Sequence, residues 1–281
     1  MKRILLPTDF SDNSINAINF AINLFKEKTC TFYFLNVFKI PYLKNEELME
    51  HNIAELKALE DQMFEESKRG LSELIEQLPE NSKHIFEPIS NYNLFSLAIH
   101  QMIIEKDIDL IVMGTKGATG AKEIFMGSNT SDTIMRNACN VIAIPEHSTF
   151  TSPKEIVFPT DYELAYSHDD LQPLIDLSKQ FDSFIRVLHF SENDELETHQ
   201  VQNKALLETF LSDVKHEYYI LSNANFEDGI NCFVQSRANI DMIVIIGRHY
   251  GFFERLFFKP KVRSLSFHTK VPLFVVHHQE E

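Results

Sequence analysis

The feature that most constrains the fold of this chain is an internal repeat. Residues 2–10 (KRILLPTDF) recur as residues 154–162 (KEIVFPTDY), 152 positions later. At the same offset, residues 31–38 (TFYFLNVF) align with residues 183–190 (SFIRVLHF). Self-similarity at a fixed offset is the sequence signature of a repeated structural unit. The repeat therefore predicts that the chain contains two copies of one unit.

A third pair of segments completes the repeat. Residues 107–112 (DIDLIV) match residues 239–244 (NIDMIV) at an offset of 132. Three matching segments in one order indicate a duplication, and the smaller last offset indicates a longer middle segment in the first copy. The 281 residues have room for two domains of about 140 residues each. We therefore predict tandem domains at residues 1–147 and 153–281, joined by a linker within residues 146–153.

Strands and helices alternate within each copy. Residues 4–9 (ILLPTD) form a short, nearly continuous apolar run, which is typical of a strand that is covered on both faces. Ser11 then offers an N-cap for a helix whose isoleucines recur at helical spacing. This alternation predicts an α/β fold of two tandem doubly wound, mainly parallel five-stranded sheets flanked by helices. The other elements expected in the first copy are strands at residues 31–38, 84–90, 107–114 and 140–145 and helices at residues 45–78, 94–106 and 128–137.

Composition excludes several classes of protein. The formal net charge is -15, so a broad basic surface for nucleic acid is not expected. No run approaches the roughly 18 apolar residues that cross a bilayer, and the apolar run near the N-terminus stops at Asp9, too early for a signal peptide. The three cysteines are far apart and form no C-x-x-C pair, which fits a reducing compartment. These observations predict a cytoplasmic protein that binds neither nucleic acid nor membrane.

Residues suited to phosphate binding follow the fourth predicted strand. Gly114 and Gly117 come directly after it, and after nine intervening residues Gly127 and Ser128 open a helix. Glycine lets a ligand approach the backbone, and a helix start presents N–H groups at the positive end of the helix dipole. Asp9 ends the first strand, where it could accept from a sugar hydroxyl or hold a divalent cation. Because ligands of open parallel sheets bind beyond the carboxyl ends of the strands, these residues define one candidate site.

This pattern, Gly-x2-Gly-x9-Gly-Ser together with a first strand that ends in Pro-Thr-Asp, resembles the universal stress protein family in its ATP-binding branch. It differs from the Walker loop and from the G-x-G-x-x-G of dinucleotide folds. The resemblance covers essentially the whole chain as a tandem pair and implies an adenine-nucleotide α-hydrolase-like fold. It also implies bound ATP, with AMP or ADP as alternatives and Mg²⁺ as a candidate companion ion.

The resemblance carries over to individual residues. It implies that Pro7, Thr8 and Asp9 line the adenosine side and that Val37 meets the adenine. No catalytic residue and no resident metal ligand is assigned, and Lys116 could add positive charge. The residues that would surround the ribose and phosphates are Met113, Gly114, Gly117, Gly127, Ser128 and Asn129.

Each of several candidates also has a purely structural interpretation. Gly114 and Gly117 could be turn glycines, and Asp9 could be only a turn or helix-cap residue. Lys116 could be a mobile, solvated side chain, and Met113 could belong to the core. These alternatives stay open on the sequence alone.

The second copy departs from the loop pattern. When Gly247 is aligned with Gly114, the later loop positions carry Tyr250, Pro260 and Lys261. Proline has no N–H to offer, and a tyrosine side chain would intrude where a phosphate should approach the backbone. The second domain is therefore predicted to have a degenerate nucleotide loop.

The strand ends of the second copy are partly retained. Asp161 matches Asp9 at the end of the first strand of each copy. The offset of 152 places His189 opposite Val37, at the proposed adenine wall. We therefore expect nucleotide binding in the first copy alone.

Three functions are consistent with this sequence. The first is an ATP-binding sensor or regulator of stress responses, in which bound nucleotide shifts the population of a surface that a protein partner reads. The second is a slow ATPase or another nucleotide-processing enzyme, although the chain has neither an HxGH nor an SGGxDS signature and no assembled catalytic set. The third is a nucleotide-free interaction scaffold.

Two further expectations concern assembly. The resemblance to the universal stress protein family implies that the last strands of the two copies, NVIAIP and VPLFVVH, pair and so form an internal pseudo-dimer; an apolar edge strand also needs to be covered. Homodimerisation of the whole chain is a further possibility.

Overall fold

The computed structural model describes residues 1–39, 53–115, 127–191, 196–222, 226–237, 239–247 and 271–278. The first half consists of β1 (Lys2–Pro7), α1 (Asp12–Leu24), β2 (Cys30–Phe38), α3 (Ile53–Glu76), β3 (His84–Tyr92), α4 (Phe95–Lys106), β4 (Leu110–Gly114), α5 (Ser128–Arg136) and β5 (Asn140–Ile144). The second half consists of β6 (Glu155–Thr160), α6 (His168–Phe181), β7 (Phe184–Ser191), α7 (Thr198–Leu211), β8 (His216–Ser222), α8 (Phe226–Ser236), β9 (Met242–Gly247) and β10 (Leu273–His277).

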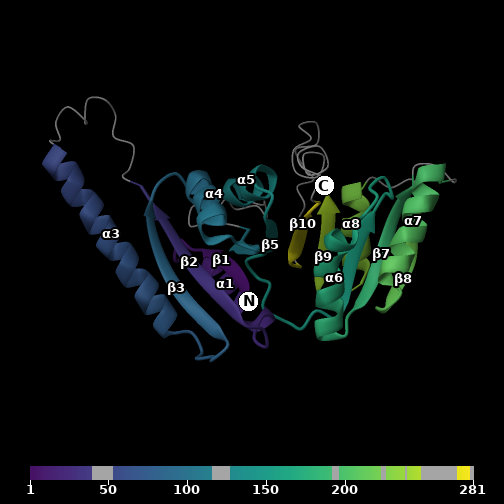
Figure 1. Cartoon of the computed structure of the whole chain (residues 1–281), viewed down its shortest axis with the longest axis horizontal. Helices are drawn as coiled ribbons and strands as arrows, with labels where there is room; N and C mark the ends of the chain where they lie inside the picture. Colours follow the sequence, from purple (N-terminus) through teal and green to yellow (C-terminus); the bar gives the residue numbers. More distant parts are fainter. Residues whose placement is uncertain are drawn as a thin grey trace.

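The predicted α/β architecture is confirmed, with one difference in its sheet. The strands form a single ten-stranded sheet in the order β3-β2-β1-β4-β5-β10-β9-β6-β7-β8 (Figure 1). Strands are parallel within each half, and the expected pairing of the last strands is present as an antiparallel β5–β10 ladder. The two five-stranded sheets therefore merge, because this pairing covers both of their inner edges.

Helices cover both faces of this sheet. Helices α1, α3, α6 and α7 contribute to the apolar cluster on one face, and α4, α5 and α8 contribute to the cluster on the other. Each cluster contains side chains of both halves, for example Phe32 and Val187 on one face and Leu35 and Leu188 on the other. The core is thus continuous across the junction.

The segment between the halves is packed against helices. The Phe150 ring lies 5.2 Å from the Phe20 ring of α1 and 6.4 Å from the Phe181 ring of α6, measured between centroids. The Asn16 side chain of α1 donates to the Ser148 carbonyl oxygen over 2.9 Å. The segment expected to be a linker therefore packs against helices of both halves.

The strand register corrects one alignment made from the sequence. Pro7 pairs with Leu35 in the first half, whereas Pro159 pairs with Leu188 in the second. His189 therefore corresponds to Asn36, not to Val37 as the offset of 152 predicted. The error arose because both second strands are runs of mostly apolar residues, in which a one-residue shift leaves the sequence match almost unchanged.

Candidate functional site

The strand order places a topological switch point in the middle of the first half. From β1 the chain adds β2 and β3 on one side and then β4 and β5 on the other, so the carboxyl ends of β1 and β4 are neighbours. Ligands of open parallel sheets bind in the crevice at such a point. Pro7, which is buried and ends β1, and Gly114, which is buried and ends β4, both lie at this edge.

The turn after β1 is held by the Thr8 hydroxyl. This oxygen lies 2.9 Å from the Ser14 hydroxyl and accepts the Phe10 N–H over 3.0 Å. Phe10 has a positive φ of 61°, a backbone conformation that a bulky residue adopts only where its surroundings impose it. Thr8 is buried, so its side chain fixes the shape of the turn.

Asp9 is exposed at the same edge. Its Oδ1 accepts the Ser11 N–H over 3.1 Å and the Ser11 hydroxyl over 2.5 Å, and Ser11 is the predicted N-cap of α1. Asp9 is therefore a turn residue beside the N-cap of α1, as one of its two interpretations predicted. An exposed carboxylate at the carboxyl edge of the sheet is also placed to meet a ligand, so the two roles are compatible.

Asn36 was not recognised from the sequence, although it organises the end of β2. It is buried, and its Nδ2 donates to the Thr8 carbonyl oxygen over 2.8 Å. The next residue, Val37, is half-buried and packs against the apolar cluster beneath α4. A polar residue inside an apolar strand was the one signal that could have singled out Asn36.

The end of β4 is shaped by close packing. A Cβ on Gly114 would lie 2.5 Å from Nδ2 and 3.1 Å from the backbone oxygen of Asn13, so the first turn of α1 requires glycine here. Met113 is 5% exposed and belongs to the core. Met113 therefore belongs to the core, whereas Gly114 is fixed by packing at the end of β4 and not by a turn.

The two ends of the glycine loop are held together. The Thr115 N–H donates to the Ile144 carbonyl oxygen over 3.0 Å, and the Gly127 N–H donates to the Thr115 carbonyl oxygen over 2.5 Å. The Thr130 hydroxyl of α5 donates to the Gly114 carbonyl oxygen over 2.9 Å. Thr115 and Thr130 are further residues that the sequence analysis missed. Lys116 and Gly117 lie outside the described residues.

The start of α5 points its donors to this edge. Gly127 is the N-cap, with no side-chain hydrogen bond at the cap, and Ser128 and Asn129 are exposed in the first turn. The first N–H groups of a helix have no intrahelical partner and lie at the positive end of its dipole. This donor set suits the oxygens of a phosphate group.

The second half repeats the turn with larger side chains. The Thr160 hydroxyl accepts the Tyr162 N–H over 3.1 Å, and Tyr162 also has a positive φ, of 60°. Tyr166 donates its hydroxyl to Thr160 over 2.9 Å, the contact that Ser14 makes with Thr8. His189 contacts the Thr160 carbonyl oxygen through Nδ1 at 3.1 Å and stacks on the Tyr162 ring at 4.3 Å between centroids.

Burial decides how these groups ionise. Burial lowers the pKa of His189 below its usual value, so the ring is neutral. Burial also raises the pKa of Tyr166, although the hydrogen bond to Thr160 opposes that shift.

Among the described residues there is no group of three or more His, Cys, Asp or Glu side chains that could hold a metal ion. Within the same residues, every helix is too short or too polar to span a membrane.

Comparison with known proteins identifies the class to which this fold and edge belong. Residues 1–145, more than half of the chain, match the sequence model of the universal stress protein family. A universal stress protein of Methanocaldococcus jannaschii is 30% identical over 155 residues, which cover 51% of this chain and 81% of the relative. A second one from the same organism is 27% identical over 154 residues, covering 51% of this chain and 94% of the relative.

A solved structure extends the likeness of fold to both halves. The crystal structure of a universal stress protein from Archaeoglobus fulgidus superposes with a TM-score of 0.70, covering 99% of this chain and 97% of the other at 17% identity. At that identity the match concerns the fold alone. The chain belongs to the universal stress protein family, on the strength of its residues 1–145.

Proposed function

We propose that this protein is a nucleotide-dependent sensor or regulator of stress responses, which acts in the cytoplasm and binds one adenine nucleotide, ATP in the first instance, at the carboxyl edge of β1 and β4. The observation that carries the proposal is the meeting of three features at one switch point: the Pro7–Asp9 turn, the glycine end of β4 and the start of α5. Family membership supports it, because the first half is the part that matches.

The proposed ligand fits the groups that are present. The α5 start supplies backbone donors for phosphate oxygens, as Gly127 has no side chain to obstruct them. Val37 offers an apolar contact for the base, and the exposed carboxylate of Asp9 offers an acceptor for a ribose hydroxyl or a ligand for Mg²⁺. We include Lys116, Gly117, Ser128 and Asn129 in the site as its phosphate side.

We propose that residues 153–281 form a second domain of the same type that does not bind nucleotide in this way. The strand order of the second half mirrors that of the first, which supports a common origin. Buried aromatic residues stabilise its carboxyl edge without a ligand. The loop residues Tyr250, Pro260 and Lys261 lie outside the described residues, so this part rests on the sequence.

The proposal is tested by calorimetric titration of ATP, ADP and AMP into nucleotide-stripped protein, with and without Mg²⁺. We expect one site per chain in the natural protein and none in Gly127→Glu, which places a carboxylate where the phosphates should bind. Thr198→Glu is the matched control, because it adds the same charge at the exposed first turn of α7 and should bind normally.

The outcomes separate the competing functions. Two sites per chain would contradict the inactive second domain, and no binding in folded protein would favour a nucleotide-free scaffold. A phosphate-release assay on the natural protein distinguishes a sensor from a slow ATPase, since turnover that Gly127→Glu abolishes would move the protein to the second class.

A further inference from the structure

The two outer edges of the sheet differ in how they are protected. Edge strands offer unpaired backbone groups to other strands, and proteins commonly block them with proline or lysine. Strand β3 (HIFEPISNY) has Pro88 at its centre. Strand β8 (HEYYILS) contains neither proline nor lysine, and no described strand pairs with its outer edge. The inner edges, β5 and β10, are already paired with each other. Among the described strands, β3 and β8 have no partner on their outer edges, and β8 is the one that contains neither proline nor lysine.

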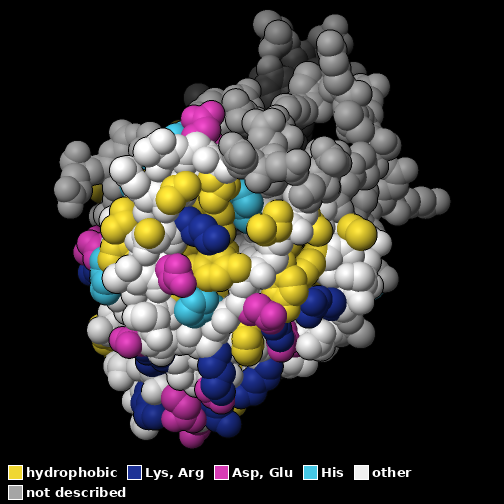
Figure 2. All heavy atoms as spheres, turned by 90° about the vertical axis from the view of Figure 1, so that its right-hand side faces the viewer, with side chains coloured by type: hydrophobic (Ala, Val, Ile, Leu, Met, Phe, Trp, Pro, Cys, Tyr) yellow, Lys and Arg dark blue, Asp and Glu magenta, His cyan; other side chains and the backbone are white. Residues whose placement is uncertain are grey.

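The side chains around this edge are apolar and exposed. Ile220 is 65% exposed on β8, and Val201 is 52% exposed on α7. The Lys204 Nζ lies 5.6 Å from the centroid of the Tyr218 ring, so this stripe of α7 borders β8. Figure 2 shows hydrophobic side chains gathered around a basic one on this side of the molecule. Contiguous apolar surface of this kind marks interaction sites in proteins.

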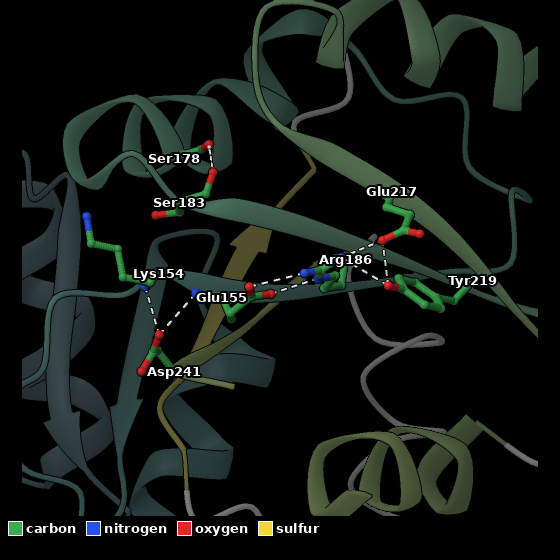
Figure 3. Close-up of polar contacts among 8 residues, drawn as sticks. All are labelled: Lys154, Glu155, Ser178, Ser183, Arg186, Glu217, Tyr219 and Asp241. Atoms are coloured by element: carbon green, nitrogen blue, oxygen red, sulfur yellow. Dashed lines mark hydrogen bonds and ion pairs between the residues drawn. The ribbon is translucent and has the colours of Figure 1, made fainter. Parts of the chain in front are cut away.

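A hydrogen-bonded network on the other face of β8 fixes the strand (Figure 3). Arg186 donates to Glu217 over 2.5 Å and to the Tyr219 hydroxyl over 3.0 Å, while two further bonds join it to Glu155. The Tyr219 hydroxyl donates to Glu217 over 2.6 Å, and its ring packs on Phe233 at 5.2 Å between centroids. The central side chain of the edge is therefore held in place before any partner arrives, which lowers the entropy lost on binding.

Charge favours a second copy of the same chain at this edge. The net charge of -15 makes two copies repel over most of their surface. At this edge, however, basic side chains accompany the acidic ones: α7 carries Lys204 as well as Glu208, and Arg186 of β7 pairs with both Glu217 of β8 and Glu155. This surface thus carries charges of both signs, so it can meet its own copy without a cluster of like charges.

The sequence of β8 is also complementary to itself. In an antiparallel pair centred on Tyr219, Tyr218 of each chain would lie opposite Ile220 of the other, and an aromatic ring opposite a β-branched residue is a favourable cross-strand pair. A two-fold interface needs such self-complementarity. We propose that β8 and the adjoining stripe of α7 pair with the same elements of a second copy, which extends the ten-stranded sheet across a two-fold axis.

The test is the mass of the full-length protein in solution, measured by sedimentation over a range of concentrations. We expect the natural protein to reach twice 32.6 kDa and Ile220→Lys to weaken the dimer by about tenfold or more, because a lysine at the edge carries charge into the interface. Ile85→Lys is the matched control at the opposite edge, where Ile85 is 49% exposed on β3, and it should dimerise normally. Both substituted side chains are largely exposed in the single chain, so circular dichroism should show the natural fold.

A second measurement needs no substitution. If β8 pairs with its copy, amide exchange in residues 216–222 should slow as the concentration rises, and exchange in residues 84–92 should not change. A natural protein that stays monomeric, a dimer that Ile220→Lys leaves intact, or protection that appears only in β3 would each overturn the proposal. None of these results depends on nucleotide binding.

Discussion

The turn after the first strand of each half shows how one backbone design is kept while its side chains change. In both halves a threonine hydroxyl accepts the N–H of an aromatic residue with positive φ. In the first half, small polar partners complete the turn, namely Ser14 and Asn36. In the second half, Tyr166 and His189 make the corresponding contacts. The turn is therefore a requirement of the fold, and the partners around it are free to diverge.

This difference has a physical meaning for function. The second half fills the surroundings of its turn with rings, among them the stacked pair Tyr162 and His189, and both side chains are almost fully buried. Apolar burial and stacking stabilise that edge without a bound molecule. The first half keeps small polar groups and an exposed Asp9 there. The carboxyl edge of the second half is thus stabilised by its own aromatic side chains and needs no bound ligand. This agrees with the proposal of one nucleotide site per chain, in the first half.

Substitutions at Tyr166 test the difference between the two turns with the largest expected effect. Tyr166→Ser introduces the side chain that serves the first half, but it removes a buried ring that packs on Phe158 at 5.5 Å between centroids. We expect a loss of about 3–5 kcal/mol in the free energy of unfolding. Tyr166→Phe keeps the ring and loses only the bond to Thr160, at a cost of about 1 kcal/mol. Urea titration measures both, and equal losses would show that the ring does not stabilise this half.

A second test asks whether Gly114 is fixed by packing rather than by a ligand. Gly114→Ala places a methyl group within 3.1 Å of the Asn13 backbone oxygen and closer still to its side chain. We expect a loss of about 1–3 kcal/mol of stability in nucleotide-free protein. Asn13→Ala removes the nearer atoms, so the double variant should recover part of that loss. A neutral Gly114→Ala in thermal unfolding would refute the packing explanation.

The junction between the halves can be weakened at Phe150. Phe150→Ala removes two aromatic contacts, one to each half, each worth about 0.5–1.5 kcal/mol. We expect the total stability to fall by about 1–2 kcal/mol and the calorimetric transition to broaden, because the halves would then unfold less cooperatively. Leu59→Ala on exposed helix α3 is the control, since Leu59 is 37% exposed and distant in sequence from the junction. An unchanged transition would show that the β5–β10 ladder alone couples the halves.

The smallest expected effect is on the pH dependence of folding stability. His189 is neutral in the fold because burial lowers its pKa, an effect that nearby Lys204 supports and that the Thr160 carbonyl and Asp161 oppose. The unfolded chain takes up the proton more readily, so stability is full above about pH 6.5 and falls as the pH decreases below it. His189→Asn supplies the amide that the first half uses, and it should flatten stability between about pH 7 and pH 5. Denaturant midpoints across this range provide the measurement, and an unaltered slope would assign the effect to another group.

Much of the fold was predictable, since the order of strands and helices follows from hydrophobic patterning. The N-cap at Ser11, the start of α5 at Ser128 and the pairing of the last strands all agree with expectation. The helix predicted over residues 45–78 is described from Ile53 to Glu76, and residues 45–52 lie outside the described part. The candidate site was predictable where glycine and Pro-Thr-Asp mark it, because these residue types follow from backbone demands. Asn36, Thr115 and Thr130 were missed, as nothing in their spacing marks the hydrogen bonds that they make.

The sequence by itself determined the α/β class and the family, because short motifs and apolar periodicity are local properties of the chain. Only the tertiary structure decided that His189 corresponds to Asn36, that Gly114 is fixed by Asn13, and that β8 ends one continuous sheet of the described strands. The physical reason is the same in each case. Strands covered on both faces are apolar throughout, so their sequences carry little information about register, about contacts across the sheet, or about which strand lies at an edge.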